Sequence, residues 1–456
     1  MELTKREFLK FSGAAAMFGA SHFAFGAAAG GKVRLAAIGT GNQASSDLHN
    51  FLGTGMAEIV CAADVWDESL AWVRKEQPGA KLYKDYRQML KECAGAYDAI
   101  TIAIPDHLHC VAFLEAAKYG VPVFCEKPLA HTLAETLAMM RVAREKGLIT
   151  HVGMQGNSDP GTPRLREWVE SGELGQVQEA HIYCNAVAFF YKLDPHLIDV
   201  PRPVPAGLDW ELWQGPAKRR AYFDTAAPGG KWRSWWPYGE GCLTDWVCHI
   251  FGPLQQALDL DLPTAVTCDS DVFDVGKSPL AFPLDPKYTF EFAAKGARGP
   301  LKVFWYDVDR TAPRPLGLDE NEPFTPLDGW AGAWLKCEKE TVMYGSHGAG
   351  GVRVVPNAHN AKFRQMPAKY PRVNGGHYRE FLSAVLERRP TNTPFEIGGK
   401  ATMVGLLGTI ATRFPGRRLE FDGKTMRFTN CPQANAYLKP EWTEAAMSEW
   451  GGELRI

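Results

Sequence analysis

Short apolar runs alternate with helical patterns from residue 33 to residue 152, and this rhythm limits the folds that the chain can adopt. Apolar runs with the length of buried strands cover residues 33–38, 58–63, 99–104, 121–124 and 149–152. Segments with helical spacing separate them and cover residues 44–52, 68–75, 109–119 and 133–146. Repeated strand–helix units build a mostly parallel sheet with helices on both faces. We therefore expect an α/β domain over residues 31–153.

The pattern changes after residue 153. Residues 177–183, 288–292 and 302–306 alternate with period two, which is typical of antiparallel strands with one covered face. Two later segments, 378–388 and 401–414, have helical spacing. We expect residues 154–456 to form an α+β domain with a large, mostly antiparallel open sheet, and the two late helices to pack back toward the first domain.

A glycine-rich turn follows the first expected strand and opens the first helix. Gly39, Gly41 and Ala44 fit a pattern in which the first glycine permits a tight turn and the second lets backbone approach a pyrophosphate. Asp64 ends the second strand, where a carboxylate can bind the ribose hydroxyls of NAD and repel the 2′-phosphate of NADP. We therefore expect a Rossmann domain that binds NAD in preference to NADP. The expected cofactor-binding residues here are Gly39, Gly41, Asn42, Gln43 and Asp64.

Two further motifs carry side chains suited to the oxidation of an alcohol. Lys127 follows the strand at 121–124, and its charge there would stabilise an alkoxide as hydride leaves the carbon. Asp245 and His249 are four residues apart, so a helix would place them on one face. An imidazole can take the hydroxyl proton near neutral pH, and a carboxylate can orient it. Taken singly, the first motif also fits a surface turn and the second a structural Asp–His pair.

In their order along the chain these motifs resemble the Gfo/Idh/MocA oxidoreductases. The resemblance covers roughly residues 32–440 and includes the Pro-Asp-His-Leu-His segment at 105–109 and the Glu-Lys-Pro segment at 126–128. It implies an NAD(P)-dependent oxidoreductase acting on CH–OH groups, with Lys127, Asp245 and His249 as the catalytic residues. It also implies that the second domain binds substrate and forms the oligomer contacts, so we expect a homo-oligomer. The further cofactor contacts that it implies come from Pro105, His107, His109, Glu126 and Lys127.

The substrate side is expected to be rich in aromatic rings. A loop before the second motif contains Trp232, Trp235 and Trp236, and aromatic rings beside hydrogen-bonding groups can bind sugars. Core packing is the alternative interpretation of such tryptophans. We expect substrate contacts from Trp235, Trp236, Arg233 and Gln155. His377 and Tyr378 are further candidates. Cysteine and histidine spacings fit no zinc motif, so we expect no metal.

The ends and the charge pattern bear on partners and location. Residues 1–30 combine a basic start, a weakly apolar Ala/Gly-rich middle and small residues at the end, as an export signal of the Tat type does. We therefore expect a periplasmic or otherwise exported protein that uses the Tat export machinery. The formal net charge of −2 and the absence of a basic run argue against nucleic acid as a partner. No other segment reaches the ~18 apolar residues of a membrane span, so we expect no stable membrane insertion.

Three functions are compatible with these features. The first is the NAD-dependent oxidation of a secondary hydroxyl of a sugar, glycoside or related polyol. An exported enzyme meets little free NAD, so the cofactor would be tightly bound and recycled within the catalytic cycle. The second is the NAD-dependent cleavage of a glycoside through transient oxidation at C3 and elimination. The third is a non-catalytic sensor that binds sugar and NAD.

Overall fold

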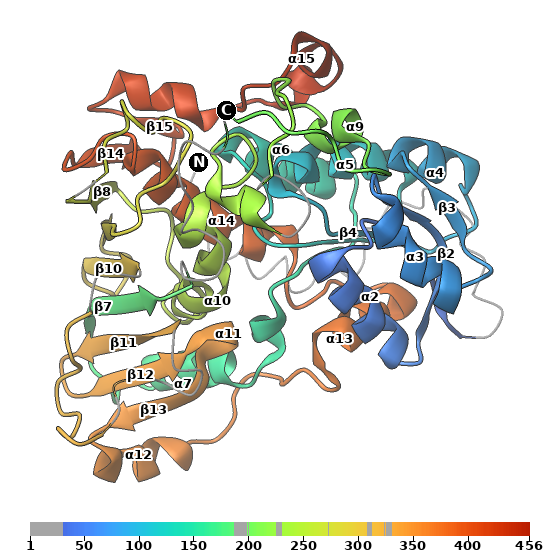
Figure 1. Ribbon diagram of the computed structural model, residues 1–456. Helices are drawn as coiled ribbons and strands as arrows, with labels where there is room; N and C mark the ends of the chain where they lie inside the picture. Colours follow the sequence, from blue (N-terminus) through green and yellow to red (C-terminus); the bar gives the residue numbers. More distant parts are fainter. Residues whose placement is uncertain are drawn as a thin grey trace.

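The computed structural model describes residues 31–186, 198, 200–224, 230–271, 273–307, 312–322, 324 and 331–456. The expected export signal at residues 1–30 lies outside this part of the chain. The described residues form two halves, each built on its own sheet (Figure 1).

The first half contains a six-stranded sheet in the order β3-β2-β1-β4-β5-β6, with every neighbouring pair parallel. This strand order is that of a Rossmann fold. The expected parallel α/β architecture is therefore confirmed, although β3 has only three residues and was not predicted. The strands are β1 (Val33–Ile38), β2 (Ala57–Ala63), β3 (Lys81–Tyr83), β4 (Ala99–Ile102), β5 (Val123–Cys125) and β6 (Thr150–Val152).

Helices connect these strands and cover the sheet. They are α2 (Asn42–Gly53), α3 (Asp67–Glu76), α4 (Tyr86–Glu92), η1 (Asp106–Leu108), α5 (His109–Ala116), η2 (Ala117–Tyr119) and α6 (Leu133–Glu145). Helix α6 begins where Thr132 accepts a hydrogen bond from the Glu135 N–H and donates its own hydroxyl to the Glu135 carboxyl group. The first of these contacts satisfies a backbone N–H group that the start of a helix leaves unpaired.

The second half contains a nine-stranded sheet in the order β13-β12-β11-β7-β10-β9-β8-β14-β15. Its neighbouring strands are antiparallel except for the parallel pair β7 and β10, so the expected mostly antiparallel sheet is confirmed. The strands are β7 (Val177–Cys184), β8 (Ala265–Asp269), β9 (Lys287–Phe292), β10 (Leu301–Asp307), β11 (Ala331–Cys337), β12 (Thr341–Gly345), β13 (Gly350–Val355), β14 (Leu419–Asp422) and β15 (Arg427–Phe428).

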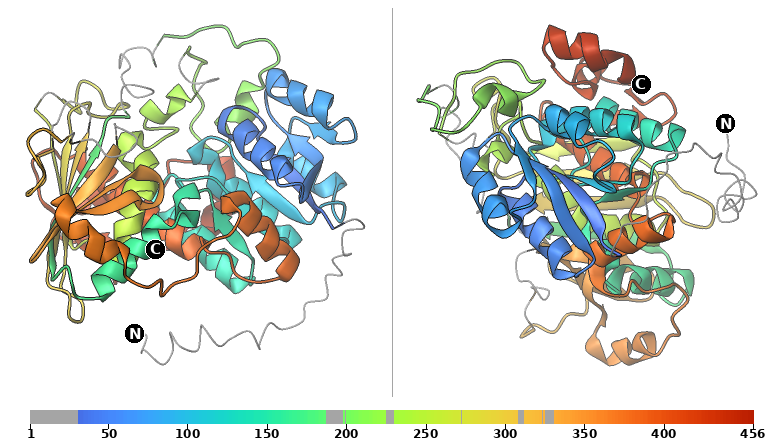
Figure 2. Two further views of the ribbon diagram at one scale, coloured as in Figure 1. Left: turned by 90° about the horizontal axis from the view of Figure 1, so that it is seen from below. Right: turned by 90° about the vertical axis from the view of Figure 1, so that its right-hand side faces the viewer.

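Helices fill the space between the two sheets, as Figure 2 shows from below. Helix α10 (Gly241–Ala257) packs against α7 (Gly161–Glu170) and α14 (Phe395–Ala411). Helix α14 is buried along most of its length and also contacts α6 and β8, so it joins the two halves. The other helices of this half are η3 (Gln155–Ser158), α9 (Trp210–Gln214), η5 (Lys231–Ser234), α11 (Ser346–Ala349), α12 (Asn357–Arg364), α13 (Gly376–Glu387), η6 (Pro432–Leu438), α15 (Glu444–Trp450) and η7 (Gly451–Glu453).

The late helix α13 lies against the first sheet. Phe381 and Leu382 on this helix join a buried cluster with Val33, Phe51 and Phe124 from the Rossmann half. The second late helix, α14, begins at Phe395 after Pro394, earlier than its periodicity predicted. In the part of the chain that the model describes, no helix combines the length and hydropathy that crossing a bilayer requires.

Phe381 provides a test of how firmly α13 is attached. Its ring is fully buried, whereas Leu386 on the same helix is 46% exposed. Phe381→Ala is expected to lower the free energy of unfolding by ~3–5 kcal/mol, because it removes a large ring and leaves a cavity. Leu386→Ala, the matched control, should change it by less than about 0.5 kcal/mol. Urea denaturation followed by circular dichroism measures both, and equal effects would contradict the packing described here.

Candidate active site

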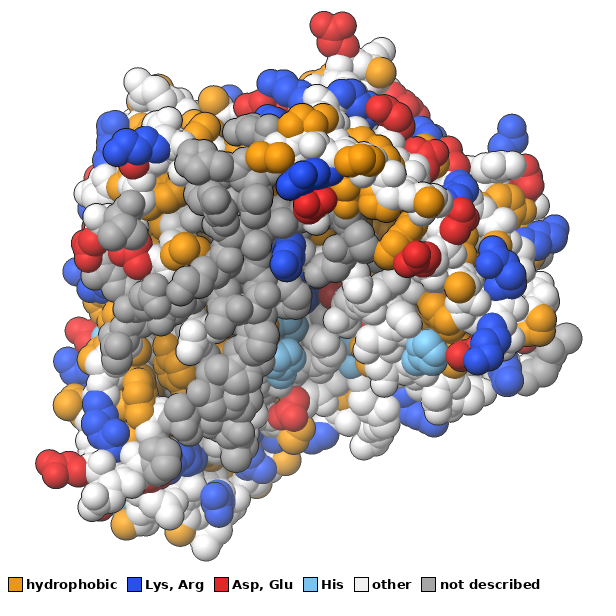
Figure 3. Space-filling view, viewed as in Figure 1, with side chains coloured by type: hydrophobic (Ala, Val, Ile, Leu, Met, Phe, Trp, Pro, Cys, Tyr) orange, Lys and Arg blue, Asp and Glu red, His pale blue; other side chains and the backbone are white. Residues whose placement is uncertain are grey.

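A cleft with a volume of about 320 Å³ lies at the carboxyl ends of the strands of the first sheet. This edge is where open α/β sheets bind their ligands. The predicted residues that line the cleft are Gly39, Gly41, Asn42, Gln43, Asp64, Pro105, Glu126, Lys127 and Arg233. Histidine side chains reach the surface in a hollow between the two halves of the molecule (Figure 3).

The glycine turn leaves room that side chains would fill. Gly39 has a φ of +92°, and a Cβ there would lie 2.2 Å from the carbonyl oxygen of Ala103. A Cβ on Gly41 would lie 2.7 Å from the hydroxyl oxygen of Ser69 and 3.9 Å from a carboxylate oxygen of Asp64. Gly39 therefore requires glycine, whereas a side chain at Gly41 would crowd Ser69 at the edge of the cleft, and no side chain caps the first turn of α2. Free N–H groups at a helix start and an open backbone cradle fit the pyrophosphate of a dinucleotide.

Asp64 is held at the side of the cleft by its own loop. Its Oδ2 accepts hydrogen bonds from the Thr40 N–H at 2.9 Å and the Thr40 hydroxyl at 3.2 Å. Its Oδ1 accepts a hydrogen bond from the Trp66 N–H at 3.0 Å. Burial raises the pKa of Asp64, and these N–H donors oppose the rise. The carboxylate retains acceptor capacity for ribose hydroxyls, which fits the predicted preference for NAD.

Lys127 and Asp245 meet at the cleft from opposite halves of the molecule. Lys127 follows β5, and its Nζ lies 2.7 Å from Oδ1 of Asp245 on α10. The Nε of Arg233 lies 3.4 Å from the other carboxylate oxygen of Asp245. Burial tends to lower the pKa of Lys127, but the Asp245 carboxylate outweighs it and the pKa is raised. Lys127 is therefore an ammonium ion whose position is set by a buried carboxylate.

His249 lies one helical turn beyond Asp245, and both side chains lie beside the cleft without lining it. It is 3% exposed, and its Nδ1 has no hydrogen-bond partner among the described residues. Its ring packs on His347 with 4.2 Å between ring centroids, and on Trp246 at 5.3 Å. Burial lowers the pKa of His249, and the neighbouring His347 and Lys127 lower it further. The imidazole is therefore neutral near pH 7 and able to accept a proton.

Two pairs of buried carboxyl groups surround Lys127, and the sequence did not predict them as pairs. Asp106 lies close to Glu240, and Asp47 lies close to Glu126, so burial together with this proximity raises the pKa of both glutamates. Burial raises the pKa of Asp106 to about 7 and raises that of Glu240 further above its usual range. Two neighbouring buried carboxyl groups disfavour each other's charged form, so each pair favours the protonation of one member. Buried acidic groups with raised pKa values therefore lie around the Lys127 ammonium ion.

His107 and His109 lie behind the cleft, although the resemblance implied that they touch the cofactor. The His109 ring nitrogens lie 2.9 Å from the carbonyl oxygen of Pro128 and 2.8 Å from that of Ile104. His107 Nε2 lies 3.1 Å from the carbonyl oxygen of Trp213. Both side chains are buried and do not line the cleft. We therefore assign them to the support of the loop that carries Pro105.

Trp235 and Trp236 also differ from their predicted role. Trp235 is fully buried and packs edge-on against Phe223. Trp236 stacks with the guanidinium of Arg413, 4.1 Å from the ring centroid. Neither ring lines the cleft, because Trp235 is buried in the core and the half-buried Trp236 packs against Phe282 and Tyr437. Trp213 of α9 and Trp232 of η5 line it instead, and residue type alone could not separate them from Trp235 and Trp236.

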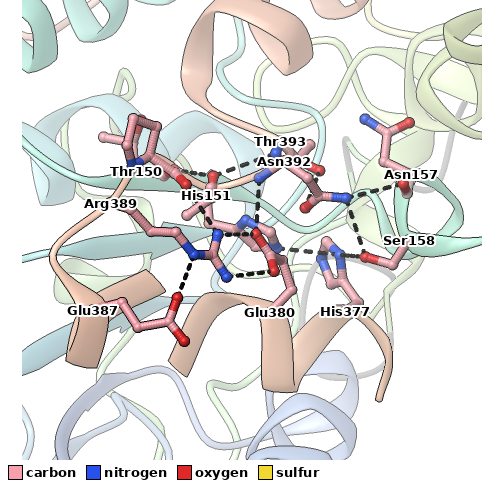
Figure 4. A network of polar contacts seen from close by, with 12 residues as sticks. Thr150, His151, Asn157, Ser158, His377, Glu380, Glu387, Arg389, Asn392 and Thr393 are labelled. Carbon is pink, nitrogen blue, oxygen red and sulfur yellow. Dashed lines mark hydrogen bonds and ion pairs between the residues drawn. The ribbon is translucent and has the colours of Figure 1, made fainter. Parts of the chain in front are cut away.

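The remaining substrate-side candidates lie at the junction of the two halves. Gln155 begins η3, and its Oε1 is buried without a hydrogen-bond partner in the described residues. His377 lies 3.2 Å from His151 and 3.3 Å from the Ser158 hydroxyl, within the network drawn in Figure 4. Tyr378 donates a hydrogen bond to Asp47 at 2.8 Å. These contacts attach α13 to the segments beside the site.

One cluster of possible metal ligands, Cys184, Cys242 and Asp307, occurs in the described residues. The Cys242 thiol lies 3.7 Å from the Cys184 sulfur and hydrogen-bonds the Asp307 carboxyl group. Asp307 also accepts a hydrogen bond from the Trp305 indole at 2.5 Å. The groups satisfy one another, so we assign them to the core of the second half.

Comparison with known proteins agrees with this geometry. Residues 33–154 match the model of an oxidoreductase family with an NAD-binding Rossmann fold, and residues 163–277 match the C-terminal alpha/beta domain of the same family. The NAD-dependent scyllo-inositol 2-dehydrogenase of Bacillus subtilis is 28% identical over 146 residues, which cover 32% of this chain and 42% of that enzyme. The chain aligns with less than half the length of the curated relatives it matches first.

Solved structures share the fold over most of the chain. The WlbA dehydrogenase of Bordetella pertussis, in complex with NADH and UDP-GlcNAcA, is 16% identical with a TM-score of 0.58, covering 86% of this chain and 99% of that one. The aldose-aldose oxidoreductase of Caulobacter crescentus is 16% identical with a TM-score of 0.54, covering 86% and 100%. The two family models together span more than half of the sequence. The chain therefore belongs to the Gfo/Idh/MocA oxidoreductase family and carries its NAD-binding Rossmann domain.

Proposed function

We propose that this protein uses NAD to oxidise a secondary hydroxyl group of a sugar, a glycoside or a related polyol. The observation that carries the proposal is the buried Lys127–Asp245 ion pair at the dinucleotide cleft, with the neutral imidazole of His249 one helical turn away. Related proteins support the substrate class, since they include an inositol dehydrogenase and an aldose-aldose oxidoreductase. Bound NAD would accept a hydride from the substrate carbon.

The protein's own residues would manage the proton and the charge. The Lys127 ammonium stabilises the oxyanion that develops on the substrate oxygen as hydride leaves. Asp245 fixes that ammonium between itself and the Rossmann half. His249, neutral because it is buried, takes the hydroxyl proton as general base. Glu126 accepts a hydrogen bond from the Lys127 N–H at 3.0 Å and holds the loop in place.

A cap formed by the C-terminal segment supports tight retention of NAD. Thr443, Ala446 and Trp450 on and beside α15 line the same cleft as the glycine turn. The Thr443 N–H donates a hydrogen bond to the Pro216 carbonyl oxygen at 2.8 Å, and a β-bridge joins Trp442 to Ala217. Salt bridging of Arg141 to Glu453 anchors the segment to α6. NAD enclosed beneath this cap would be recycled within the catalytic cycle.

Retention can be tested on α15 itself. Trp450→Ala removes a ring from the cleft and is expected to raise the Kd for NAD about tenfold, the size expected for one aromatic contact. Met447→Ala is the matched control, because Met447 is on the same helix, is 41% exposed and does not line the cleft. Denaturing extraction of the purified protein and equilibrium dialysis measure bound NAD. Wild-type protein that purifies without nicotinamide, or equal Kd values for both variants, would contradict retention.

Retained NAD makes redox-neutral chemistry possible. The glycoside-cleaving alternative would use retained NAD in the same way. A panel of sugars and 4-nitrophenyl glycosides, followed for both NADH absorbance and released nitrophenol, separates the two. Oxidised product without nitrophenol supports the oxidoreductase, whereas nitrophenol without net NADH supports cleavage. If neither signal appears with any member of the panel, the proposed function fails and the sensor alternative gains.

Location belongs to the proposal as well. We infer that residues 1–30 direct the folded, NAD-loaded protein out of the cytoplasm through the Tat machinery. Fractionation of cells that make the full chain should find the protein in the periplasm. Replacement of the basic pair Lys5-Arg6 by Gln-Gln should retain it in the cytoplasm with its NAD. Unchanged export of this variant would contradict the signal assignment.

A further inference from the structure

His347 occupies an unusual backbone position beside the proposed active site. It lies in the short α11 segment that connects β12 to β13. Its φ and ψ are 52° and 58°, and Ala349 also has a positive φ of 59°. Side-chain-bearing residues adopt this left-handed conformation rarely, and such positions cluster at functional sites. Two of them in one turn show that the surrounding structure imposes this shape.

Glycines on the neighbouring elements hold the turn in place. A Cβ on Gly348 would lie 1.8 Å from the carbonyl oxygen of Gly156 in η3. A Cβ on Gly156 would lie 2.1 Å from the carbonyl carbon of His347, and one on Gly161 would lie 2.2 Å from the carbonyl oxygen of Ala349. The turn and η3 therefore touch backbone to backbone. This close packing restricts the backbone of the turn, and with it the direction of the Cα–Cβ bond of His347.

This arrangement brings the His347 ring against His249. Their centroids are 4.2 Å apart and their planes differ by 25°. The Trp246 ring stands nearly perpendicular to the His347 ring at 5.7 Å. The Ser346 hydroxyl lies 2.8 Å from Nδ1 of His347, which orients the ring. His347 is half-buried whereas His249 is buried, so His347 is the more accessible of the two.

We propose that His347 is a specificity-determining residue that binds the hydroxyl group next to the one being oxidised. The inference rests on the proposed function, because it takes the hydroxyl group at His249 to be the one that is oxidised. Because the two ring centroids are only 4.2 Å apart, neighbouring hydroxyl groups of one substrate can reach both imidazoles together. The site would then select vicinal diols. The ligand class is a cyclic polyol or sugar with an unsubstituted hydroxyl beside the reacting carbon.

The charged groups around the two histidines are consistent with proton acceptance by His249 and hydroxyl binding by His347. Lys127, His377 and His347 are the charged or titratable groups that lower the pKa of His249 from the elements packed around it. His249 therefore accepts the reacting proton only transiently. His347 can hydrogen-bond a second hydroxyl group through a ring nitrogen. No further co-reactant is required.

His347→Phe is the decisive variant, because it keeps an aromatic ring for the stack and removes both ring nitrogens. The probes are methyl β-D-glucopyranoside and its 2-, 3- and 4-deoxy analogues, offered to the NAD-loaded full chain. In wild type, kcat/KM should fall with each deoxy analogue that lacks a neighbour of the reacting hydroxyl. His347→Phe should lower kcat/KM for the parent sugar about 10- to 100-fold, mainly through KM, and change the value for the analogue lacking its partner hydroxyl less than twofold.

His359→Phe is the matched control, since His359 lies on the exposed α12 and pairs with Glu340. NAD content and Tm should remain at wild-type values in both variants, which separates a substrate contact from a folding defect. Equal losses with every sugar, or no loss, would overturn the assignment of His347. Isothermal titration calorimetry measures sugar binding and therefore tests the inference even without turnover. Sugar binding that depends on His347, with no oxidation, would count against the proposed function alone. Absence of any sugar binding would overturn both.

Discussion

Replacing Lys127 by methionine is expected to lower kcat by about 10²–10³-fold, the loss typical when one preorganised stabiliser of a developing oxyanion is removed. The reason is geometric, because the ammonium is held 2.7 Å from Asp245 at the edge of the dinucleotide cleft. NAD content should be unchanged, since the glycine turn and Asp64 are untouched. Steady-state kinetics on a substrate found with the sugar panel, together with cofactor extraction, measure both quantities.

Folding must be separated from chemistry in this variant. Loss of Lys127 leaves the buried Asp245 carboxylate with Arg233 nearby and without its closest partner, so some stability is lost. The double variant Lys127→Met, Asp245→Asn removes both charges of the pair and should recover most of that stability without recovering activity. Lys91→Met on the exposed end of α4 serves as the control and should behave like wild type. Wild-type turnover by Lys127→Met would remove the basis of the proposed function.

Gly39→Ala is expected to weaken NAD binding at least about 100-fold, the equivalent of a few kcal/mol of lost binding free energy. A Cβ at this position would overlap the carbonyl oxygen of Ala103 at 2.2 Å, so the turn must move away from the pyrophosphate. Gly55→Ala is the matched control, because it introduces backbone strain without a steric overlap. Gly55 also has a positive φ, +73°, but a Cβ there meets nothing within 4 Å.

Quenching of protein fluorescence on NAD addition measures the Kd in both variants. Gly55→Ala should lose a little stability through its left-handed backbone and bind NAD as wild type does. If both variants lost NAD equally, the cause would be strain in the fold. If Gly39→Ala bound NAD normally, the cleft would not be the dinucleotide site.

Much of the fold could be predicted because it depends on periodicity. Strand β4 buries every residue, β1 buries all but Arg34, and β9 buries every second residue, and these patterns are visible in the sequence. β3 was missed because three residues, only partly buried, carry no such signal. The pairing of β7 with β10 in parallel joins residues far apart in the chain, which local patterns do not report.

The site was predictable where a motif fixed the backbone and was missed where only packing decides. The glycine turn and the Asp245–His249 spacing each specify a local geometry, so the cleft contains Gly39 and Gly41 and the ion pair contains Asp245. Trp235 and Trp232 have similar neighbours in sequence, yet one is core and the other lines the cleft. His347 had no signal at all, because its role depends on a turn pressed against η3.

The two members of the central ion pair come from different halves of the molecule: Lys127 follows strand β5 of the parallel sheet, and Asp245 lies on helix α10 of the second half. The value of kcat should therefore depend on how the two halves are aligned. Gly405→Ala would place a Cβ 2.8 Å from the hydroxyl oxygen of Thr244. This variant should lower kcat although every reacting group is intact. Substitutions at buried positions between the two halves can therefore change kcat although the substituted residues do not contact the substrate.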